Sequence, residues 1–385
     1  MPINKTLYCM LCNFPLSKIN DSKEHLIINA IGGRKKISGV LCKSCNSQAG
    51  HKWDTALAKQ LNPLNLLFKI KRDQGNAPPQ NFETITGEQI RLHFDGTITP
   101  SKPDVQEVKI GNTQQIQIKA RSLKEAMGIV AGKKKKYPTL NIEAFEKNLN
   151  IQSQYLNDPV KMEFSFGGDD AIKSLVKSVL VLAVKNEIDP LCCQNALCYL
   201  KNTDAKICFG FYYEKDPILN RPQDKIFHCI AIMGNSKIGL LLGYIELFGS
   251  QRIMICLSDS YTGCNVYDAY SIDPVSGEEL DLQFDISLTQ GDLATLYRHE
   301  KAPFDSAKRA FEHVMAIACR NKFTEEKNRV LDSAISHAFE NCGAKENDVL
   351  TEEHIKKMIP LLFEKLMSFL KKHLNTPTTS SISSK

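Results

Sequence analysis

Two pairs of cysteines near the N-terminus limit what this chain can fold into more than any other feature. Cys9 and Cys12 form one C-x2-C pair, and Cys42 and Cys45 form a second. Two such pairs supply four thiolates, which complete the tetrahedral shell of a structural zinc ion. A complete shell leaves no open position, so this zinc is expected to stabilise the fold and to take no part in chemistry. Burial of the four as ordinary reduced thiols is the alternative interpretation.

The segment between the two pairs, residues 13–41, is longer than the spacing of an ordinary zinc ribbon and must carry structure of its own. It holds Glu24 and His25 before an apolar run, then a Gly-Gly pair with a basic tip, and then a short run that enters Cys42. This order predicts a strand, a turn and a second strand. A helix is expected from Lys43 onward, because residues suited to one face recur at spacings of three and four: Ala49, Trp53, Ala56, Leu57, Gln60 and Leu61.

With these motifs, residues 9–61 resemble the HNH nucleases, the ββα-metal fold, in the subtype that carries four cysteines. The resemblance rests on the paired knuckles, the acid-His pair between them and Asn46 directly after the last cysteine. It implies that His25 is a general base and that Glu24 and Asn46 ligate a catalytic divalent metal. It also implies hydrolysis of phosphodiester bonds that leaves 5′-phosphate and 3′-hydroxyl ends. Many members have Asp in place of Glu24 and His in place of Asn46.

The residue chemistry agrees with what the resemblance implies. Glu24 and Asn46 offer only oxygen ligands, which suit Mg²⁺ or Mn²⁺. An imidazole with the ordinary pKa of about 6.5 is mostly neutral at pH 7, so His25 is able to accept a proton. Because neighbours in a strand point to opposite faces, Glu24 and His25 share a site only if the backbone twists or bulges there. An ordinary strand role for His25 and a helix-capping role for Asn46 are the plainer alternatives.

The charge distribution indicates a polyanionic partner. Residues 1–73 hold 12 lysine and arginine residues against 4 aspartate and glutamate residues, whereas the other 312 residues carry a net charge of −2. All of the excess positive charge therefore lies with the cysteine-framed segment. His51 lies off the i+4 face of Asn46, so a surface or phosphate-contacting role is expected rather than metal binding. We expect DNA, with RNA as the alternative, to be contacted by residues of the hairpin tip and the helix: Arg34, Lys35, Lys36, Lys43, His51, Lys52 and Lys59.

The sequence predicts an α+β chain in four parts. Residues 1–72 are expected to form the zinc-stapled ββα-metal module, residues 73–288 a mixed α+β domain with a mostly antiparallel sheet, residues 289–375 a helical region and residues 376–385 a disordered tail. Strands are expected at residues 82–86, 90–94, 105–119, 162–166, 207–213, 226–233, 239–248, 252–258 and 266–272. Helices are expected at residues 122–132, 169–187, 306–320, 325–340 and 351–374, and the helix at 169–187 is apolar enough to be buried.

Several chemically suggestive residues have structural explanations. Lys133–Lys136 precede Tyr-Pro and are expected as a solvated run in a loop, with contact to nucleic acid as the alternative. His228 lies in an apolar run and is expected in a strand at the edge of the core. Asp169 and Asp170 are expected to stabilise a helix start. Three further cysteines are expected as buried thiols: Cys192, Cys193 and Cys198.

A membrane or secreted protein is not expected. No apolar run reaches the length of about 18 residues that a membrane span needs, and the N-terminus lacks the apolar core of a signal peptide. With no secretion signal, 13 cysteines indicate a reducing cytoplasm.

Two functions are compatible with these features. The first is a metal-dependent endonuclease, by analogy a restriction or anti-phage defence effector, whose region after residue 73 selects a target, docks a protein partner or forms an oligomer. The second is a non-catalytic zinc module that binds nucleic acid within a larger assembly.

Overall fold

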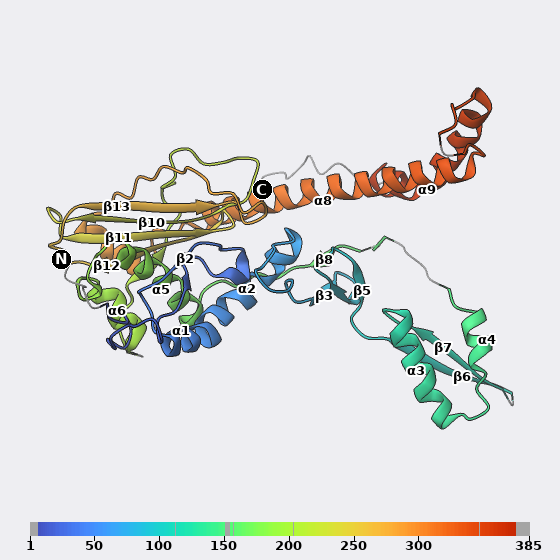
Figure 1. Cartoon of the computed structure of the whole chain (residues 1–385), viewed down its shortest axis with the longest axis horizontal. Helices are drawn as coiled ribbons and strands as arrows, with labels where there is room; N and C mark the ends of the chain where they lie inside the picture. The colour runs from blue at the N-terminus through green and yellow to red at the C-terminus, as the bar shows by residue number, and fades with distance from the viewer. Residues whose placement is uncertain are drawn as a thin grey trace. The chain divides into compact units, whose positions relative to one another are not determined.

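The computed structural model describes residues 7–111, 113–150, 155–156, 158–202, 204–345 and 347–374. The chain divides into two compact units, residues 1–311 and residues 312–385 (Figure 1). The expected α+β class, with antiparallel sheets and a helical C-terminal region, is confirmed. The expected boundaries after residues 72 and 288 both fall inside the first unit. The expected disordered tail, residues 376–385, lies outside the described residues.

The N-terminal segment folds in the order that its motifs predict. Strand β1 (Glu24–His25) pairs antiparallel with β2 (Lys36–Ile37), and helix α1 (Lys43–Ala49) follows. The helix continues through a π-helical turn, η2 (Gly50–Asp54), into α2 (Thr55–Leu67). The apolar residues after His25 do not extend β1, because the chain leaves the ladder for a 3-10 turn, η1 (Asn29–Ile31).

The Gly-Gly pair is required by the turn between these strands. A Cβ on Gly33 would lie 1.7 Å from the carbonyl oxygen of Ile27, so no other residue fits there without displacing the backbone. Gly32 has a φ of +97°, in the left-handed region that glycine adopts at little cost. The chain therefore reverses direction between β1 and β2 as the motif predicts.

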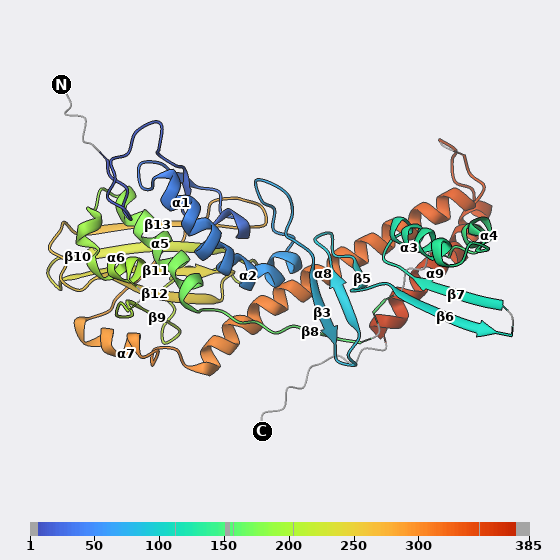
Figure 2. The same cartoon turned by 90° about the horizontal axis from the view of Figure 1, so that it is seen from below.

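The core of the first unit is a five-stranded antiparallel sheet in the order β13-β10-β11-β12-β9. Alternate residues of its strands point to opposite faces, and both faces are buried. One face packs against residues 282–296, and the other packs against helices α5 and α6 (Figure 2). The elements are α5 (Asp169–Lys185), α6 (Gln194–Lys201), β9 (Phe209–Phe211), β10 (His228–Asn235), β11 (Leu240–Leu247), β12 (Gln251–Ser258) and β13 (Val266–Ile272).

Helix α5 lies between this sheet and the N-terminal segment, in contact with both η2 and α2. All of its residues from Ala171 to Ala183 are buried, which confirms the expectation of a buried helix. On the sheet side, a Cβ on Gly243 would lie 2.0 Å from Val179, so glycine permits the close approach of β11. Four of the buried residues are polar and recur at positions i, i+1, i+4 and i+5, on one side of the helix: Lys173, Ser174, Lys177 and Ser178.

His228 fixes the large sheet to the N-terminal segment. Its Nε2 donates to the carbonyl oxygen of Ile31 at 2.8 Å, and its Nδ1 accepts from the backbone N–H of Phe248 at 2.9 Å. The expected strand is confirmed, but the residue is fully buried rather than at the edge of the core. Asn65 of α2 makes a second link nearby, because its side-chain amide donates to the carbonyl oxygen of Ala30 at 3.1 Å. The N-terminal segment is therefore docked on the sheet.

Residues 80–161 hold a smaller antiparallel sheet in the order β5-β4-β3-β8. A separate hairpin of β6 and β7 precedes two helices, α3 and α4. The bounds are β3 (Gln80–Thr84), β4 (Gln89–Leu92), β5 (Ile98–Pro100), β6 (Asp104–Ile110), β7 (Thr113–Lys119), α3 (Leu123–Lys136), α4 (Ile142–Lys147) and β8 (Val160–Lys161).

Two expectations for this region are wrong. Lys133–Lys136 form the last turn of α3 rather than a loop, because lysines are favourable at the negative end of a helix and Pro138 stops the helix only afterwards. Residues 162–166 do not form a strand. Phe164 and Phe166 instead make edge-on ring contacts that hold this segment in place.

The helical C-terminal region comprises η4 (Gln290–Asp292), α7 (Leu293–Tyr297), α8 (Phe304–Asn341) and α9 (Glu352–Leu374). Helix α8 is continuous, so the expected break between residues 320 and 325 is wrong. Three of the four intervening residues are polar and the fourth is Phe323, but none is glycine or proline, and such residues continue a helix at little cost. Across the described ranges, no helix has the length and apolar character needed to cross a membrane.

The cysteines outside the N-terminal pairs are not uniformly buried. Cys193 is buried, whereas Cys192 and Cys198 are exposed, so the expectation of buried thiols is wrong for those two. Cys192 lies in a short 3-10 turn, and Cys198 lies on the outer side of α6.

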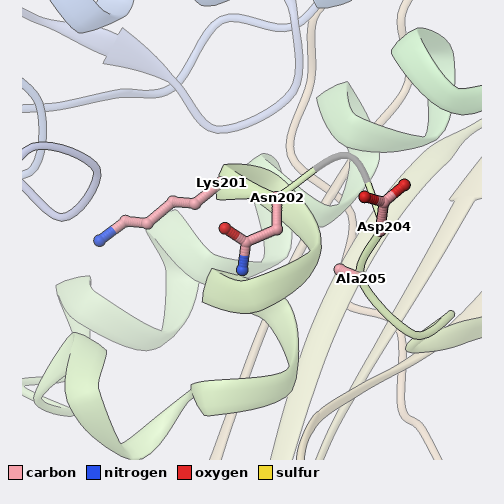
Figure 3. A pocket seen from close by; sticks show the side chains of 4 residues that line it. All are labelled: Lys201, Asn202, Asp204 and Ala205. Atoms are coloured by element: carbon pink, nitrogen blue, oxygen red, sulfur yellow. The ribbon is translucent and has the colours of Figure 1, made fainter.

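Two surface hollows occur near the helices that cover the large sheet. One, at the end of α6, is lined by Lys201, Asn202, Asp204 and Ala205, whose side chains point in different directions rather than toward one another (Figure 3). The other lies between α2 and the start of α5, and its lining includes Lys52, Gln60 and Asp170. Only the second hollow adjoins the residues that the motifs single out.

Candidate functional site

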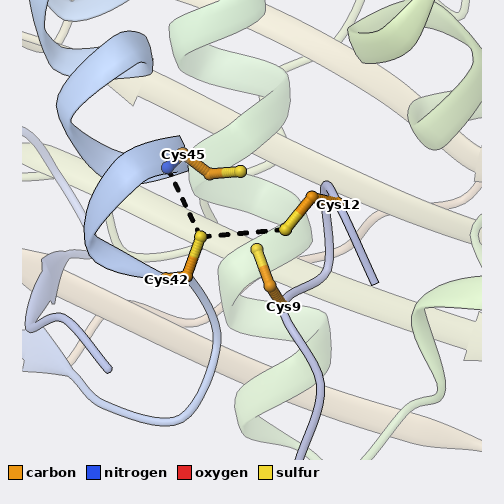
Figure 4. Close-up of side chains that lie close together, drawn as sticks. All are labelled: Cys9, Cys12, Cys42 and Cys45. Atoms are coloured by element: carbon orange, nitrogen blue, oxygen red, sulfur yellow. Dashed lines mark hydrogen bonds between the residues drawn. The ribbon is translucent and has the colours of Figure 1, made fainter. Parts of the chain in front are cut away.

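The four cysteines of the two pairs form one cluster (Figure 4). The sulfur atoms of Cys9, Cys12, Cys42 and Cys45 all lie within 4.8 Å of one another. Cys42 caps helix α1, and its Sγ accepts a hydrogen bond from the backbone N–H of Cys45 at 3.5 Å. Burial alone would raise the pKa of Cys9, but backbone hydrogen bonds outweigh it and lower that pKa to about 7. Ionisation is therefore favoured at Cys9, whereas burial raises the pKa of Cys12 and Cys45.

This cluster fits a structural zinc ion. Tetrahedral geometry with Zn–S bonds of about 2.3 Å places the sulfur atoms about 3.8 Å apart. The Sγ atoms of Cys12 and Cys42 are 3.7 Å apart. Four thiolates would close the shell, so the ion would join the loop before β1 to the start of α1 without an open position for a reactant.

Glu24 lies at the centre of a second cluster. It is 3% exposed, and its carboxylate contacts the ammonium group of Lys177, which projects from α5. The same ammonium lies 2.8 Å from Oδ2 of Asp54, and the Ser174 hydroxyl donates to Oδ1 of Asp54 at 2.6 Å. The Asn46 side chain lies close enough to Glu24 to lower the pKa of its carboxyl. We call these five residues the carboxylate–lysine cluster.

The π-helical turn η2 explains how Asn46 and Asp54 reach the same cluster. Asp54 follows Asn46 by eight residues, and in a regular α-helix this separation places two side chains about 80° apart around the helix axis. A π turn inserts one extra residue, which reduces this offset to about 20°. Asn46 and Asp54 therefore share the helix face that meets Glu24 and α5.

Charge pairing favours the ionised form of the cluster. Burial alone would lower the pKa of Lys177, but the carboxylates of Asp54 and Glu24 outweigh it and raise that pKa. Burial raises the pKa of Glu24, and contact with Lys177 opposes this change. Because an unpaired ammonium group is costly in a site that is 0% exposed, we take both partners to be charged.

The motifs of the sequence do not single out Lys177, Asp54 or Ser174. A signal was present, because Lys173 and Lys177 recur at i and i+4 in a helix otherwise apolar enough to be buried. Lysine is rarely buried without a partner. A buried lysine therefore implies a carboxylate elsewhere in the chain, but the helix itself does not indicate which one.

His25 has different neighbours from Glu24. Its Nε2 lies 3.4 Å from Oδ2 of Asp73, the oxygen that Lys36 binds at 2.7 Å. The backbone N–H of Asp73 donates to Oδ1 of Asn29 at 3.0 Å, which fixes this segment. Within the part of the chain that the structure describes, Nε2 of His25 is buried and has no hydrogen bond of good geometry. Asp73 is a further neighbour that the motifs did not indicate.

Burial and the Lys36 charge lower the pKa of His25 below its ordinary value. The imidazole is therefore neutral at pH 7. The lysine at the centre of the other cluster contributes as well, because the charge of Lys177 also lowers the pKa of His25. Glu24 and His25 thus contact different residues, but the charge of Lys177 acts to lower the pKa of both.

At the hairpin tip, the basic residues contact other parts of the first unit. Lys35 lies 3.7 Å from Glu279 and over the ring of Tyr270, with its Nζ 4.6 Å from the ring centroid. Lys36 binds Asp73, and the exposed Arg34 lies against Gly277.

Along the helix, Lys43, His51, Lys52 and Lys59 are all exposed. Lys43 donates to the carbonyl oxygen of Ile19 at 2.6 Å, and Lys52 lies 3.5 Å from Asp170.

Comparison with known proteins identifies the N-terminal segment. Residues 9–62 match the family model of the HNH endonucleases. The match confirms the resemblance that the motifs indicate, over nearly the same residues, and indicates a nuclease module. Neither the comparison with curated proteins nor that with solved structures gives a match. We call residues 9–62 the HNH module.

Proposed function

We propose that this protein is a metal-dependent endonuclease that hydrolyses phosphodiester bonds in DNA. The observation that carries the proposal is the state of His25 inside an HNH module: Nε2 is buried and lacks a good hydrogen bond among the described residues. Its lowered pKa leaves the imidazole neutral at pH 7, so this nitrogen is able to accept a proton from an attacking water.

Glu24 and Asn46 would hold the divalent ion, and their oxygen donors suit Mg²⁺ or Mn²⁺. Such an ion, when bound, neutralises charge on the scissile phosphate and on the leaving oxygen. Lys177 already engages Glu24, so binding of the ion is expected to be weak. We assign Lys177 a positioning role, because its charge opposes the burial-driven rise in the pKa of Glu24 and its ammonium links Glu24 and Asp54 to α5.

The exposed basic residues of the helix support contact with DNA phosphates more than those of the hairpin tip do. Lys43, His51, Lys52 and Lys59 are exposed, and the Lys52–Asp170 pair is a surface pair of small energy that a phosphate is able to displace. At the tip, Arg34, Lys35 and Lys36 already contact the first unit. RNA is the alternative substrate, because phosphate contacts of this kind do not distinguish the two.

We further propose that residues 73–288 select the target or dock a protein partner. None of the 13 cysteines, all of which lie in the described residues, forms a disulfide, which supports placement in the cytoplasm. A role in restriction or anti-phage defence rests on analogy with chains that combine a nuclease module and a larger domain.

The test is incubation of the purified full chain with supercoiled plasmid and with single-stranded RNA, in Mg²⁺, in Mn²⁺ and in EDTA. We expect nicking or linearisation in either metal and none in EDTA, at an EDTA exposure short enough to leave zinc content unchanged. The products should carry 5′-phosphate and 3′-hydroxyl ends, so DNA ligase should reseal nicks without prior end repair. Full activity in EDTA would remove the divalent ion from the proposal.

One observation favours the second candidate, a non-catalytic zinc module that binds nucleic acid. Glu24 is buried and its carboxylate is already paired with Lys177, and such a pair is compatible with a purely structural role. Tight, salt-sensitive binding of DNA with no cleavage in any divalent metal would support the non-catalytic module over the endonuclease.

A further inference from the structure

Helices α8 and α9 of the second unit form an antiparallel hairpin (Figure 2). The ring of Phe323 in α8 contacts the rings of Phe369 and His373 in α9, and His337 lies 3.5 Å from Glu364. Residue numbers therefore increase along α8 in the direction in which they decrease along α9. All of these contacting residues lie in the second unit.

Each helix exposes a row of large apolar side chains directly beside the row that faces its partner. On α8 the buried row, on the face of Phe323, is Val330, Ala334 and Ala338, and the exposed row is Leu331, Ile335 and Phe339. On α9 the half-buried row, on the face of Phe369, is His354, Met358, Leu362 and Leu366, and the exposed row is Ile355, Ile359, Phe363 and Met367.

The two exposed rows lie on the same side of the hairpin. A helix turns by about 100° per residue, so each exposed row is rotated by that angle from its inward row. Because the helices are antiparallel, equal rotations about their own axes carry both rows toward one side. The seven side chains are 38% to 52% exposed, although all are large and apolar. We call this surface the apolar hairpin face.

We propose that the apolar hairpin face is a dimer interface, on which the same face of a second copy of this chain packs to form a four-helix bundle. Hairpins with one uncovered apolar side are the halves from which such bundles are built. This inference goes beyond the proposed nuclease function and does not depend on it.

The charges of the hairpin identify the occupant as a second copy. Around the turn, residues 340–353 include five acidic residues and one basic residue, and two of the five, Glu352 and Glu353, also pair with Lys356 and Lys357 on exposed α9. At the open end, residues 320–329 and 365–372 together include seven basic residues and two acidic ones. A two-fold axis across the hairpin would place the acidic turn of each copy against the basic open end of the other. The surface is therefore complementary to itself in one orientation.

The size of the face is sufficient for a weak but specific dimer. The paired length Phe323–Asn341 corresponds to about 28 Å of helix, and two adjacent helices are about 20 Å wide. These dimensions give about 1,100 Å² over both copies, near the lower end for specific interfaces. Self-association is thus expected at micromolar concentrations.

Sedimentation velocity of the full chain at about 1–50 µM tests the interface. We expect the wild type to dimerise and the double variant Ile359→Glu/Phe363→Glu to be monomeric, with a dissociation constant raised at least about 100-fold. The matched control is Leu219→Glu, which changes a 66% exposed apolar residue of the first unit and should leave the dimer intact. Far-UV circular dichroism and zinc content should be unchanged in both variants.

A charge-swap pair tests the orientation. Glu352→Lys/Glu353→Lys and Lys371→Glu/Lys372→Glu should each weaken self-association about tenfold or more, because like charges then meet. Mixed together, the two variants should form heterodimers in preference to either homodimer. A wild type that stays monomeric at about 50 µM overturns the proposal, even if this face then captures lipid vesicles or another protein. A dimer that survives Ile359→Glu/Phe363→Glu, or charge variants with no preference for each other, also overturns it.

Discussion

Lys177 and Glu24 lie 153 residues apart in the chain and form a buried ion pair between helix α5 and the HNH module. The side chain of Lys177 is fully enclosed, and Asp54 binds its ammonium from a second direction. Buried pairs of this kind add little net stability while both partners are present, but removal of one partner leaves an uncompensated charge. The arrangement of the candidate site therefore depends on a helix that the HNH module does not contain.

Lys177→Met should destabilise the protein and abolish nuclease activity together. Loss of the ammonium leaves Glu24 and Asp54 close together and unpaired, so the free energy of unfolding should fall by about 3–5 kcal/mol. Urea denaturation and plasmid cleavage measure the two effects. Lys185→Met on the same helix is the matched control: it breaks a partly exposed pair with Asp268, and its effect should stay below about 1 kcal/mol.

The double variant Glu24→Gln/Lys177→Met distinguishes charge from packing. Removal of the unpaired carboxylate should restore part of the stability that Lys177→Met loses, but it should not restore cleavage. A double variant whose losses simply add would show that the two side chains are not energetically coupled.

The zinc frame leads to a second prediction. The wild type should contain one zinc ion per chain, and Cys12→Ser should lose it and unfold the HNH module, because binding of a structural zinc supplies about 10 kcal/mol or more of folding free energy. Cys192→Ser is the control, since Cys192 is also exposed but lies outside the cluster. Elemental analysis measures zinc, and limited proteolysis reports unfolding of the module. Wild-type zinc content in Cys12→Ser would contradict the assignment.

The features that sequence predicted correctly are those whose physical cause is local. The cysteine spacing selects zinc geometry, the Gly-Gly pair is needed for a close reversal at Gly33, and the three- and four-residue spacing from Lys43 marks a helix. The alternation and apolar character of residues 226–272 likewise predicted the four longest strands of the large sheet. In each case the responsible residues are close together in the chain.

What sequence did not predict depends on contacts between distant segments. Nothing near Glu24 indicates that Lys177 neutralises it, and nothing near His25 indicates Asp73. The polar break expected in α8 was wrong because polarity does not stop a helix unless glycine or proline is present. The sequence also did not predict that the basic hairpin tip packs against residues 270–279, because a basic turn has the same composition whether it is paired or free.

A third prediction concerns the general base. His25→Ala should reduce cleavage by about 10²–10⁴-fold while zinc content and DNA affinity change little. His51→Ala, which removes an exposed histidine of the same module, should retain activity within about tenfold. Single-turnover cleavage of a labelled duplex measures both. Wild-type cleavage by His25→Ala would place the chemistry elsewhere.

The pH profile tests the same residue without removing it. Because burial and Lys36 lower the pKa of His25, kcat/KM should rise with pH through a pKa below the ordinary value of about 6.5 and level off above it. Asp73 acts in the opposite direction, raising the pKa of His25. Asp73→Asn should therefore shift the acidic limb to still lower pH. A shift to higher pH would contradict the assignment of His25 as the titrating base.

The last prediction concerns acid stability and rests on His228. Burial lowers the pKa of this residue to about 4 in the folded state, where its two nitrogens are held by Ile31 and Phe248. In the unfolded chain the pKa is about 6.5. Below that value the unfolded state takes up a proton that the folded state does not, so stability falls with decreasing pH until about pH 4 and then levels off. The loss from this residue should be about 3 kcal/mol in total.

Urea denaturation at intervals between pH 7 and pH 4 measures this dependence, with His228→Gln as the comparison because its side chain does not titrate. The variant should be less stable than the wild type at pH 7, since it cannot reproduce both hydrogen bonds as well, and the difference should shrink or reverse near pH 4. Protonation of the zinc thiolates also destabilises the protein in acid, but it affects both chains equally and cancels in the difference. A stability difference that stays constant from pH 7 to pH 4 would show that His228 is not the group that takes up the proton on unfolding.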